Sequence, residues 1–158
     1  MRKKNQNLKR LSGDWTFAEI SISYKVDVIN KTKITSSDDS YKIIRSVWNP
    51  ELIELQEQTM AFFLNRANQL IAYRLLNTGS MNASIIDIKL LVSLALHSMA
   101  SYVIITHNHP SGNLNPSKGD EKITKRIKEA LSLIDVELLD HMIITKTNYF
   151  SFANEGLL

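Results

Sequence analysis

Cysteine is absent from this chain of 158 residues, and so is any long uninterrupted apolar run. The lack of cysteine excludes disulfide bonds and thiolate metal sites, so any bound metal must be held by histidine and carboxylate side chains. No stretch approaches the ~20 consecutive apolar residues of a membrane-spanning helix. The sequence also contains no repeats and no low-complexity tracts. These absences favour one ordinary globular domain.

Positive charge is concentrated at the amino terminus. The net charge of the whole chain is only +3, and residues 1–10 supply much of it. No apolar segment follows them, so we expect no secretory signal and a cytoplasmic protein. The basic stretch is typical of a solvated tail, but it would also suit an arm that binds nucleic acid. The sequence does not separate these two interpretations.

Composition and pattern divide the chain into a basic flexible tail (1–12), an N-terminal extension (13–50) and a main domain (51–158). Strict apolar alternation from Ile20 to Val28 predicts a half-buried strand in the extension. A short helix should follow, with Asp38 or Asp39 as its cap, and Asn49-Pro50 should close it.

The main domain alternates strand patterns with helix patterns. In chain order these predict a strand over 57–65, a second strand over 69–76 that forms a hairpin with it, a loop over 77–80, a central helix over 88–99, a strand over 101–106, a helix from residue 117, and strands over 138–145 and 149–152. This order is typical of an α/β sandwich with a mixed sheet flanked by helices.

Two of the four histidines fall at the end of the predicted strand over 101–106. His107 and His109 are separated by one residue, so in an extended segment their side chains lie on the same face. Loops that follow strand ends are where α/β proteins place their chemistry. The pair could also be loop histidines with backbone partners, so alone it does not decide between a metal site and a structural role.

Asp120 strengthens the metal interpretation. The pattern Ser117-x-x-Asp120 before an apolar run resembles a capping box, which would need no metal. Yet Asp120 shares a helical stripe with Ile123 and Ile127, so it heads the buried face of the helix. A buried carboxylate without a partner is costly, and a divalent cation would keep it ionised. We therefore expect this carboxylate and the histidine pair to bind one cation, with a position left for water.

Four other residues need an interpretation. Ser117 could cap the helix by accepting from a backbone N–H, while its hydroxyl proton stays free to hydrogen-bond a developing oxyanion. Asp140-His141 lies inside an apolar strand, so structural burial is commoner than a role in orienting the ligands. We expect His97, on the central helix, to pack in the core.

The pattern His107-x-His109, seven residues, Ser117, two residues, Asp120 resembles the JAMM (MPN+/JAB) metalloprotease motif at each of its positions. Three stretches look like the RadC family within that fold: 106–112 (Thr-His-Asn-His-Pro-Ser-Gly), 138–144 (Leu-Leu-Asp-His-Met-Ile-Ile) and 149–156 (Tyr-Phe-Ser-Phe-Ala-Asn-Glu-Gly). The resemblance covers roughly residues 54–158, and it is specific because separate motifs agree in order and distance.

The resemblance implies a cytidine-deaminase-like MPN (JAB/JAMM) sandwich and a zinc-dependent hydrolase that cuts amide or isopeptide bonds. It implies that His107, His109 and Asp120 hold Zn²⁺, with water as the fourth ligand.

The resemblance also implies two catalytic side chains. Ser117 would support the tetrahedral intermediate. The family takes its general base from an earlier strand, and Glu57 matches that glutamate best, with Glu54 as the alternative.

The chain departs from the family in two places. Many RadC-like chains carry a His-Pro-Arg-Glu run where this one has Asp87-Ile88-Lys89-Leu90. This difference bears on a polar cluster beside the site and leaves the metal ligands untouched. We expect the helix-turn-helix region that often precedes the domain in the family to be absent here, with the alternating strand and short helix in its place.

The leading interpretation is a zinc metallopeptidase that acts on an unknown protein or peptide substrate. Two alternatives stay open. One is a nucleic-acid-associated protein, since the family's traditional label ties it to DNA repair. The other is a catalytically silent MPN module that mediates protein contacts. A deaminase-like zinc site would bring cysteine ligands, and the chain has none. No membrane partner is expected, and the oligomeric state is open.

Overall fold

The computed structural model describes residues 32–79 and 86–158. The basic tail and the strand expected between Ile20 and Val28 lie outside the described residues. The described part of the chain forms, in order, α1 (Ser37–Val47), β1 (Gln58–Leu64), β2 (Leu70–Thr78), α2 (Ile88–His97), β3 (Tyr102–Asn108), α3 (Lys118–Ser132), β4 (Glu137–Ile144) and β5 (Tyr149–Ser151).

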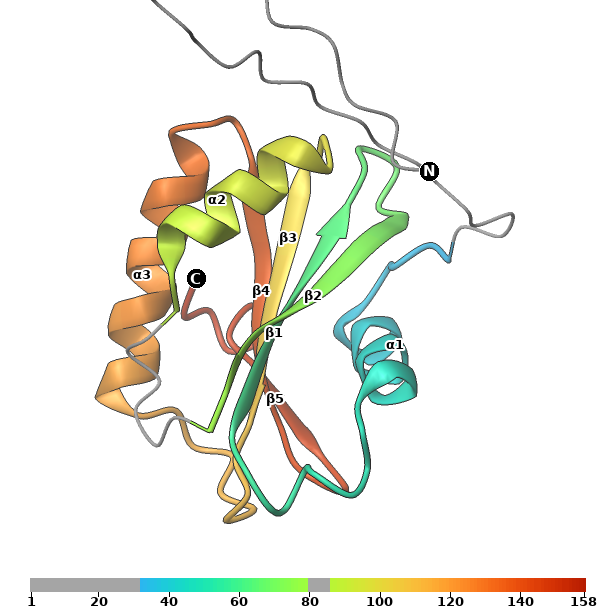
Figure 1. The fold of residues 1–158 in the computed structure, drawn as a ribbon, viewed down its shortest axis with the longest axis vertical. Helices are drawn as coiled ribbons and strands as arrows, with labels where there is room; N and C mark the ends of the chain where they lie inside the picture. Colours follow the sequence, from blue (N-terminus) through green and yellow to red (C-terminus); the bar gives the residue numbers. More distant parts are fainter. Residues whose placement is uncertain (1–31, 80–85) are drawn as a thin grey trace, which may run out of the picture.

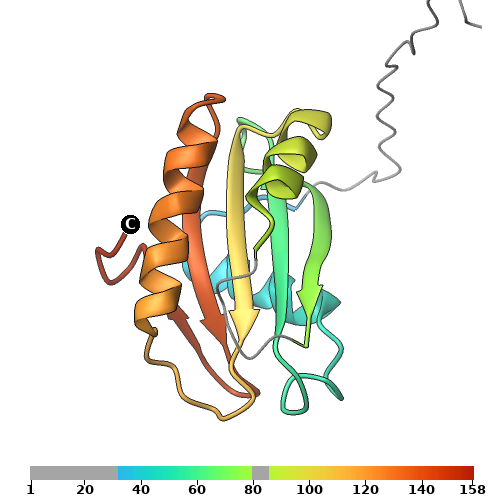
Figure 2. The same cartoon turned by 60° about the vertical axis from the view of Figure 1, so that its left-hand side comes forward.

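The strands form one mixed sheet in the order β2-β1-β3-β4-β5. Strands β3 and β4 run parallel, and the other neighbouring pairs are antiparallel. Helix α1 covers one face of the sheet, and α2 and α3 cover the other (Figure 1, Figure 2). The α/β sandwich with a mixed sheet flanked by helices, predicted from the sequence, is therefore confirmed.

Each face of the sheet carries its own apolar core because β1 is buried along its whole length. Ala61 and Phe63 face α2 and α3, whereas Met60, Phe62 and Leu64 belong to the cluster that contains α1. Burying one such large side chain fully contributes about 1.5–3 kcal/mol to stability. The strand is therefore buried on both of its faces.

Helix α3 brings a carboxylate to one end of the sheet. Its stripe Ile123, Ile127 and Leu131 is buried in the core, and Asp120 on the same stripe is 0% exposed. The side chain of Ser117 accepts from the Asp120 N–H, and the Asp120 carboxylate accepts from the Ser117 N–H. The capping box is therefore real, and the residue that completes it is also the one expected to bind metal.

The cap of α1 is Ser36, so the expectation of Asp38 or Asp39 was wrong. The Ser36 side chain accepts from the Asp39 N–H, while the Asp39 carboxylate accepts from the N–H and hydroxyl of Thr35. Both aspartates lie in the first turn, where the helix dipole favours negative charge. Ile44 of α1 belongs to a core cluster of the sheet, and the domain boundary at residue 50 stays a prediction.

Helix α2 is a surface helix rather than the central one expected. Of its residues only Leu91 and Ala95 are buried, and Leu90 and Leu96 are 40% and 50% exposed. His97, expected to pack in the core, is exposed at the end of the helix. The apolar period locates the buried stripe of a helix but does not give the depth at which the helix lies.

The functional end of the sheet is the one at which β3 and β4 both finish. Residues 109–117 leave β3 and lead to the amino terminus of α3, at the lower end of the molecule in Figure 1. Strand β2 continues through Asn77 and Thr78, inside the predicted loop, because both residues pair with β1. None of the helices in the two described ranges is long and apolar enough to cross a membrane.

Candidate metal centre

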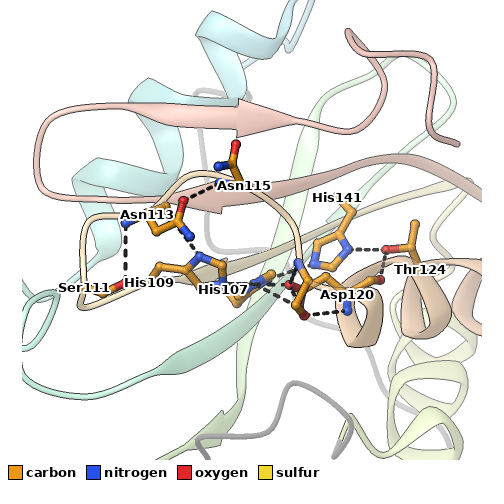
Figure 3. Close-up of polar contacts among 9 residues, drawn as sticks. His107, His109, Ser111, Asn113, Asn115, Asp120, Thr124 and His141 are labelled. Carbon is orange, nitrogen blue, oxygen red and sulfur yellow. Dashed lines mark hydrogen bonds and ion pairs between the residues drawn. The ribbon is translucent and has the colours of Figure 1, made fainter.

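Three side chains from two elements converge at the carboxyl end of β3. His107 lies on β3, His109 follows it, and Asp120 comes from the first turn of α3. His107 and Asp120 are buried and His109 is half-buried. The three side chains point toward one another (Figure 3). Within the described residues, they form a group of histidine and acidic side chains that could hold a metal ion.

The donor atoms are spaced as the ligands of one ion would be. His107 Nε2 lies 3.0 Å from His109 Nε2 and 3.3 Å from Asp120 Oδ1, and His109 Nε2 lies 3.8 Å from Asp120 Oδ2. Ligands placed tetrahedrally around zinc at ~2.0–2.2 Å are ~3.3–3.6 Å apart. The triangle therefore fits a single divalent ion with little movement, and three protein donors leave a fourth position for water or substrate.

In the neutral form of His109 the proton lies on Nδ1, the ring nitrogen that faces away from the other two donor residues. His109 Nδ1 lies 2.6 Å from the main-chain carbonyl oxygen of Asn113. A carbonyl oxygen can only accept, so Nδ1 is the nitrogen that carries the proton. The lone pair of His109 Nε2 therefore faces the other two donors.

His107 is uncharged near neutral pH. Burial lowers its pKa to about 4, an effect that the Asp120 charge opposes and the nearby His109 reinforces. His107 Nδ1 lies 2.9 Å from Nε2 of His141, which packs behind it. The pKa of His141 is also well below its ordinary value, again because of burial. Neither of these two buried rings therefore supplies a positive charge to neutralise the aspartate.

Asp120 has one satisfied and one unsatisfied carboxylate oxygen. Its Oδ2 accepts from the N–H and the hydroxyl of Ser117, each at 2.7 Å. Its Oδ1 is buried and has no hydrogen-bond partner. Leaving a buried anionic oxygen unsatisfied is costly. A divalent cation would satisfy this oxygen and both imidazole lone pairs at once, so the residues present fit a metal ion.

Glu57 lies beside the donors, immediately before β1. Thr59 of β1 pairs with His107, so Glu57, two residues earlier, belongs to the same end of the sheet. The side chain is half-buried. Burial raises the pKa of Glu57, His109 lowers it, and the Asp120 charge raises it. These charge effects place the carboxyl group within electrostatic reach of the centre.

Asn108, between the two histidines, holds the segment that carries Glu57. Its Oδ1 accepts from the Gln58 N–H at 2.7 Å, and its Nδ2 donates to the carbonyls of Ile53 and Gln56 at 2.7 and 2.9 Å. Asn108 is 0% exposed. Its role could not be predicted from the sequence, because its partners are about 50 residues away in the chain and no local pattern points to them.

The side chains of Ser117 and Glu54 both have partners that the sequence did not predict. The Ser117 hydroxyl donates to Asp120 Oδ2, so its proton is engaged rather than free. Glu54, the alternative base, is exposed and pairs with Lys146 at 2.7 Å. Asp87, where the family has its polar run, accepts from the Leu90 N–H and caps α2.

A cleft of about 670 Å³ opens beside the centre. Its walls come from the segment before β1, from Gly79 and from the loop after β3. The lining residues are Leu55, Gln56, Glu57, Gly79, His109, Pro110, Ser111, Asn113, Asn115, Pro116 and Ser117. A substrate in this cleft would reach His109, Glu57 and Ser117 from solvent.

Asp140 and His141 project to opposite faces of β4. Asp140 faces α1 and accepts from the hydroxyls of Ser37 and Ser151 and the N–H of Ala153. His141 faces the metal centre. Both side chains are buried, as the commoner interpretation from the sequence expects, and His141 in addition contacts His107.

The comparisons with known proteins agree on one family. A family model described as the RadC-like JAB domain matches residues 34–157. A UPF0758 protein from Flavobacterium johnsoniae is 43% identical over 132 residues, which cover 83% of this chain and 56% of that protein. The UPF0758 protein YeeS from Escherichia coli is 42% identical over 103 residues, which cover 65% of this chain and 70% of that protein.

A UPF0758 protein from Chlorobium chlorochromatii is 39% identical over 105 residues, which cover 66% of this chain and 47% of that protein. The chain thus spans about half the length of two of these relatives. Their names state no reaction, substrate or partner.

Proposed function

The chain belongs to the RadC-like JAB domain family, and from this premise we propose that it is a zinc-dependent hydrolase of peptide or isopeptide bonds. The observation that carries the proposal is the buried Asp120 Oδ1, which has no hydrogen-bond partner and lies 3.3 Å from His107 Nε2. His107, His109 and Asp120 would hold the ion. When bound, zinc would lower the pKa of water toward ~7 and polarise the scissile carbonyl.

Glu57 would act as the general base. Its carboxylate would take a proton from the attacking water and pass the proton to the leaving amine. Its position at the cleft wall beside His109 supports this role. Its raised pKa would bring proton uptake closer to neutral pH.

Ser117 would stabilise the oxyanion with its hydroxyl group. For this, the proton on Oγ would turn from Asp120 Oδ2 toward the substrate oxygen. Asp120 would keep its position during this turn because the Ser117 N–H also binds Oδ2, at 2.7 Å. One residue can therefore cap α3 and still supply a donor to the cleft.

The lining of the cleft favours a polypeptide substrate over nucleic acid. No lysine or arginine is among the described residues that line it, and the one charged carboxylate, Glu57, would repel phosphate. Amide, hydroxyl and proline side chains suit an uncharged peptide backbone. The cytoplasmic location expected from the sequence stays a prediction.

The test is cleavage of a complex peptide mixture that contains both linear and lysine-branched amide bonds, with new amino groups identified by mass spectrometry. The zinc-loaded protein should cleave, and Glu57→Gln should retain zinc while losing about 10²–10⁴-fold in rate. Glu54→Gln is the matched control and should cleave normally, because Glu54 pairs with Lys146 away from the cleft.

Three outcomes would contradict the proposal. Zinc binding without cleavage by the unmodified chain would indicate a silent interaction module. Unchanged cleavage by Glu57→Gln would remove its role as base. DNA binding that weakens steeply with salt and survives chelation, without any peptide cleavage, would favour the nucleic-acid alternative.

A further inference from the structure

We propose that His141 and Thr124 are positioning residues that fix the tautomer of His107 and so present its Nε2 lone pair to the metal. This inference rests on the metal centre of the proposed function. Neither residue is a ligand. They lie behind His107, on β4 and α3 respectively, and are 1% and 2% exposed (Figure 3).

The direction of the hydrogen bonds made by Thr124 and His141 follows from the main-chain carbonyl oxygen of Asp120, which has no proton and can only accept. Thr124 Oγ1 lies 2.6 Å from the main-chain carbonyl oxygen of Asp120, so Thr124 must donate its only proton there. Thr124 Oγ1 also contacts His141 Nδ1. Because the hydroxyl proton is already used, Nδ1 must be the donor in this second contact.

The tautomer of His107 follows from that of His141. A neutral His141 with its proton on Nδ1 has a bare Nε2, which lies 2.9 Å from His107 Nδ1. This Nε2 can only accept, so His107 carries its proton on Nδ1. The other nitrogen of His107, Nε2, is then left with a lone pair directed at Asp120 Oδ1 and His109.

The chain of contacts forms a closed ring that begins and ends at one ligand. It runs from the Asp120 carbonyl through Thr124 and His141 to His107, whose Nε2 faces the Asp120 carboxylate. The main chain of one ligand therefore sets the protonation of another. Phe152 stacks on the His141 ring, with centroids 4.8 Å apart and an interplanar angle of 14°, and so restricts its rotation.

Removing the Thr124 hydroxyl should weaken zinc binding without removing any ligand. In Thr124→Val the His141 Nδ1–H loses its acceptor, so His141 can switch tautomer and stop accepting from His107. Loss of such an outer partner typically lowers metal affinity about 10–100-fold. Thr124→Ser keeps the hydroxyl and should bind zinc within a fewfold of the unmodified chain. The zinc Kd is measured by competition with a chromophoric chelator.

Thr106→Val is the matched control. Thr106 is a fully buried threonine whose hydroxyl has no hydrogen-bond partner, so the same change of hydroxyl to methyl should leave the zinc Kd unchanged. His141→Leu should weaken zinc at least as much as Thr124→Val. If Thr124→Val and His141→Leu fold and bind zinc as tightly as Thr106→Val, the proposal is wrong.

A second readout needs neither zinc nor catalysis. Nitrogen chemical shifts of the imidazoles in the metal-free protein should show the proton on Nδ1 in both His107 and His141. The His107 pattern should become a tautomer mixture in Thr124→Val and be restored in Thr124→Ser. Protons on Nε2 in the unmodified chain would overturn the inference. A protein with these tautomers that binds no zinc would instead contradict the proposed function.

Discussion

Glu57 is the residue whose protonation should depend most visibly on bound metal. Burial and the Asp120 charge both raise its pKa in the metal-free protein. A raised pKa means that folding favours the protonated form. Its contribution to stability is therefore present at acid pH and is lost as the pH rises through the raised value.

Zinc binding should reverse the upward shift of the Glu57 pKa. A cation beside the carboxylate favours its ionised form, so we expect the Glu57 pKa to lie above its ordinary value without zinc and to fall when zinc is added. A carboxyl-carbon NMR titration of the protein with and without the metal measures both values. A Glu57 pKa that does not change on zinc binding would place this side chain away from the ion.

Asn108 should matter for activity more than for metal binding. In Asn108→Ala the buried main-chain groups of Ile53, Gln56 and Gln58 lose their partner. We expect a loss of about 1–3 kcal/mol in the free energy of unfolding, measured in urea. Hydrolysis should fall further than zinc content, because the segment that carries Glu57 is no longer held. Equal losses of hydrolysis and of zinc content would contradict the view that Asn108 acts mainly through the position of Glu57.

The amino terminus of α3 combines a helix cap with a candidate metal ligand. Ser36 and Ser117 cap α1 and α3 in the same way, each accepting from the backbone N–H three residues later. Replacing either by alanine should therefore lower the free energy of unfolding by about 1 kcal/mol.

Only Ser117→Ala should also weaken zinc binding, by roughly tenfold, because it removes a donor to Asp120 Oδ2. Ser36→Ala is the matched control, since α1 lies on the other face of the sheet. Denaturation in urea and chelator competition separate the two effects. A similar change of zinc affinity in both variants would mean that the cap acts only through general stability.

Local patterns predicted which three side chains converge at the candidate metal centre. His107 and His109 stand where a continuous apolar strand meets a loop, and Asp120 continues the apolar stripe of a helix. Each of these signals lies within a few residues of the side chain that it concerns. The elements could be predicted for the same reason, since burial imposes a period of two or 3.6 residues on the sequence.

Contacts between distant elements could not be predicted in this way. His141 reaches His107 across 34 positions in the chain, and no pattern in β4 distinguishes it from a histidine packed for structural reasons. Helix depth was also missed, so His97 was placed in the core. The cap of α1 was wrong because three polar residues, Ser36, Asp38 and Asp39, could each have begun that helix.

Metal binding should stabilise the whole fold. The ligands come from β3 and α3, so they are assembled only in the native state. An ion at 100 times its Kd then adds about 2.7 kcal/mol, which should raise the Tm by roughly 5–10 °C. Scanning calorimetry with and without zinc measures the shift. Asp120→Ala should show no shift, and a comparable rise in that variant would indicate binding elsewhere.

The described residues contain one candidate centre of two histidines and an aspartate, and His109 of this centre lines a cleft.

The most direct measurement is X-ray absorption at the zinc edge on the protein loaded with one equivalent of zinc. If His107, His109 and Asp120 bind the ion, the spectrum should show four nitrogen or oxygen ligands at about 2.0–2.1 Å with the scattering pattern of two imidazoles. That pattern should be lost or reduced to one imidazole in His107→Ala and in His109→Ala. A zinc ion without imidazole ligands, or a chain that takes up no zinc, would contradict the assignment of His107, His109 and Asp120 as zinc ligands.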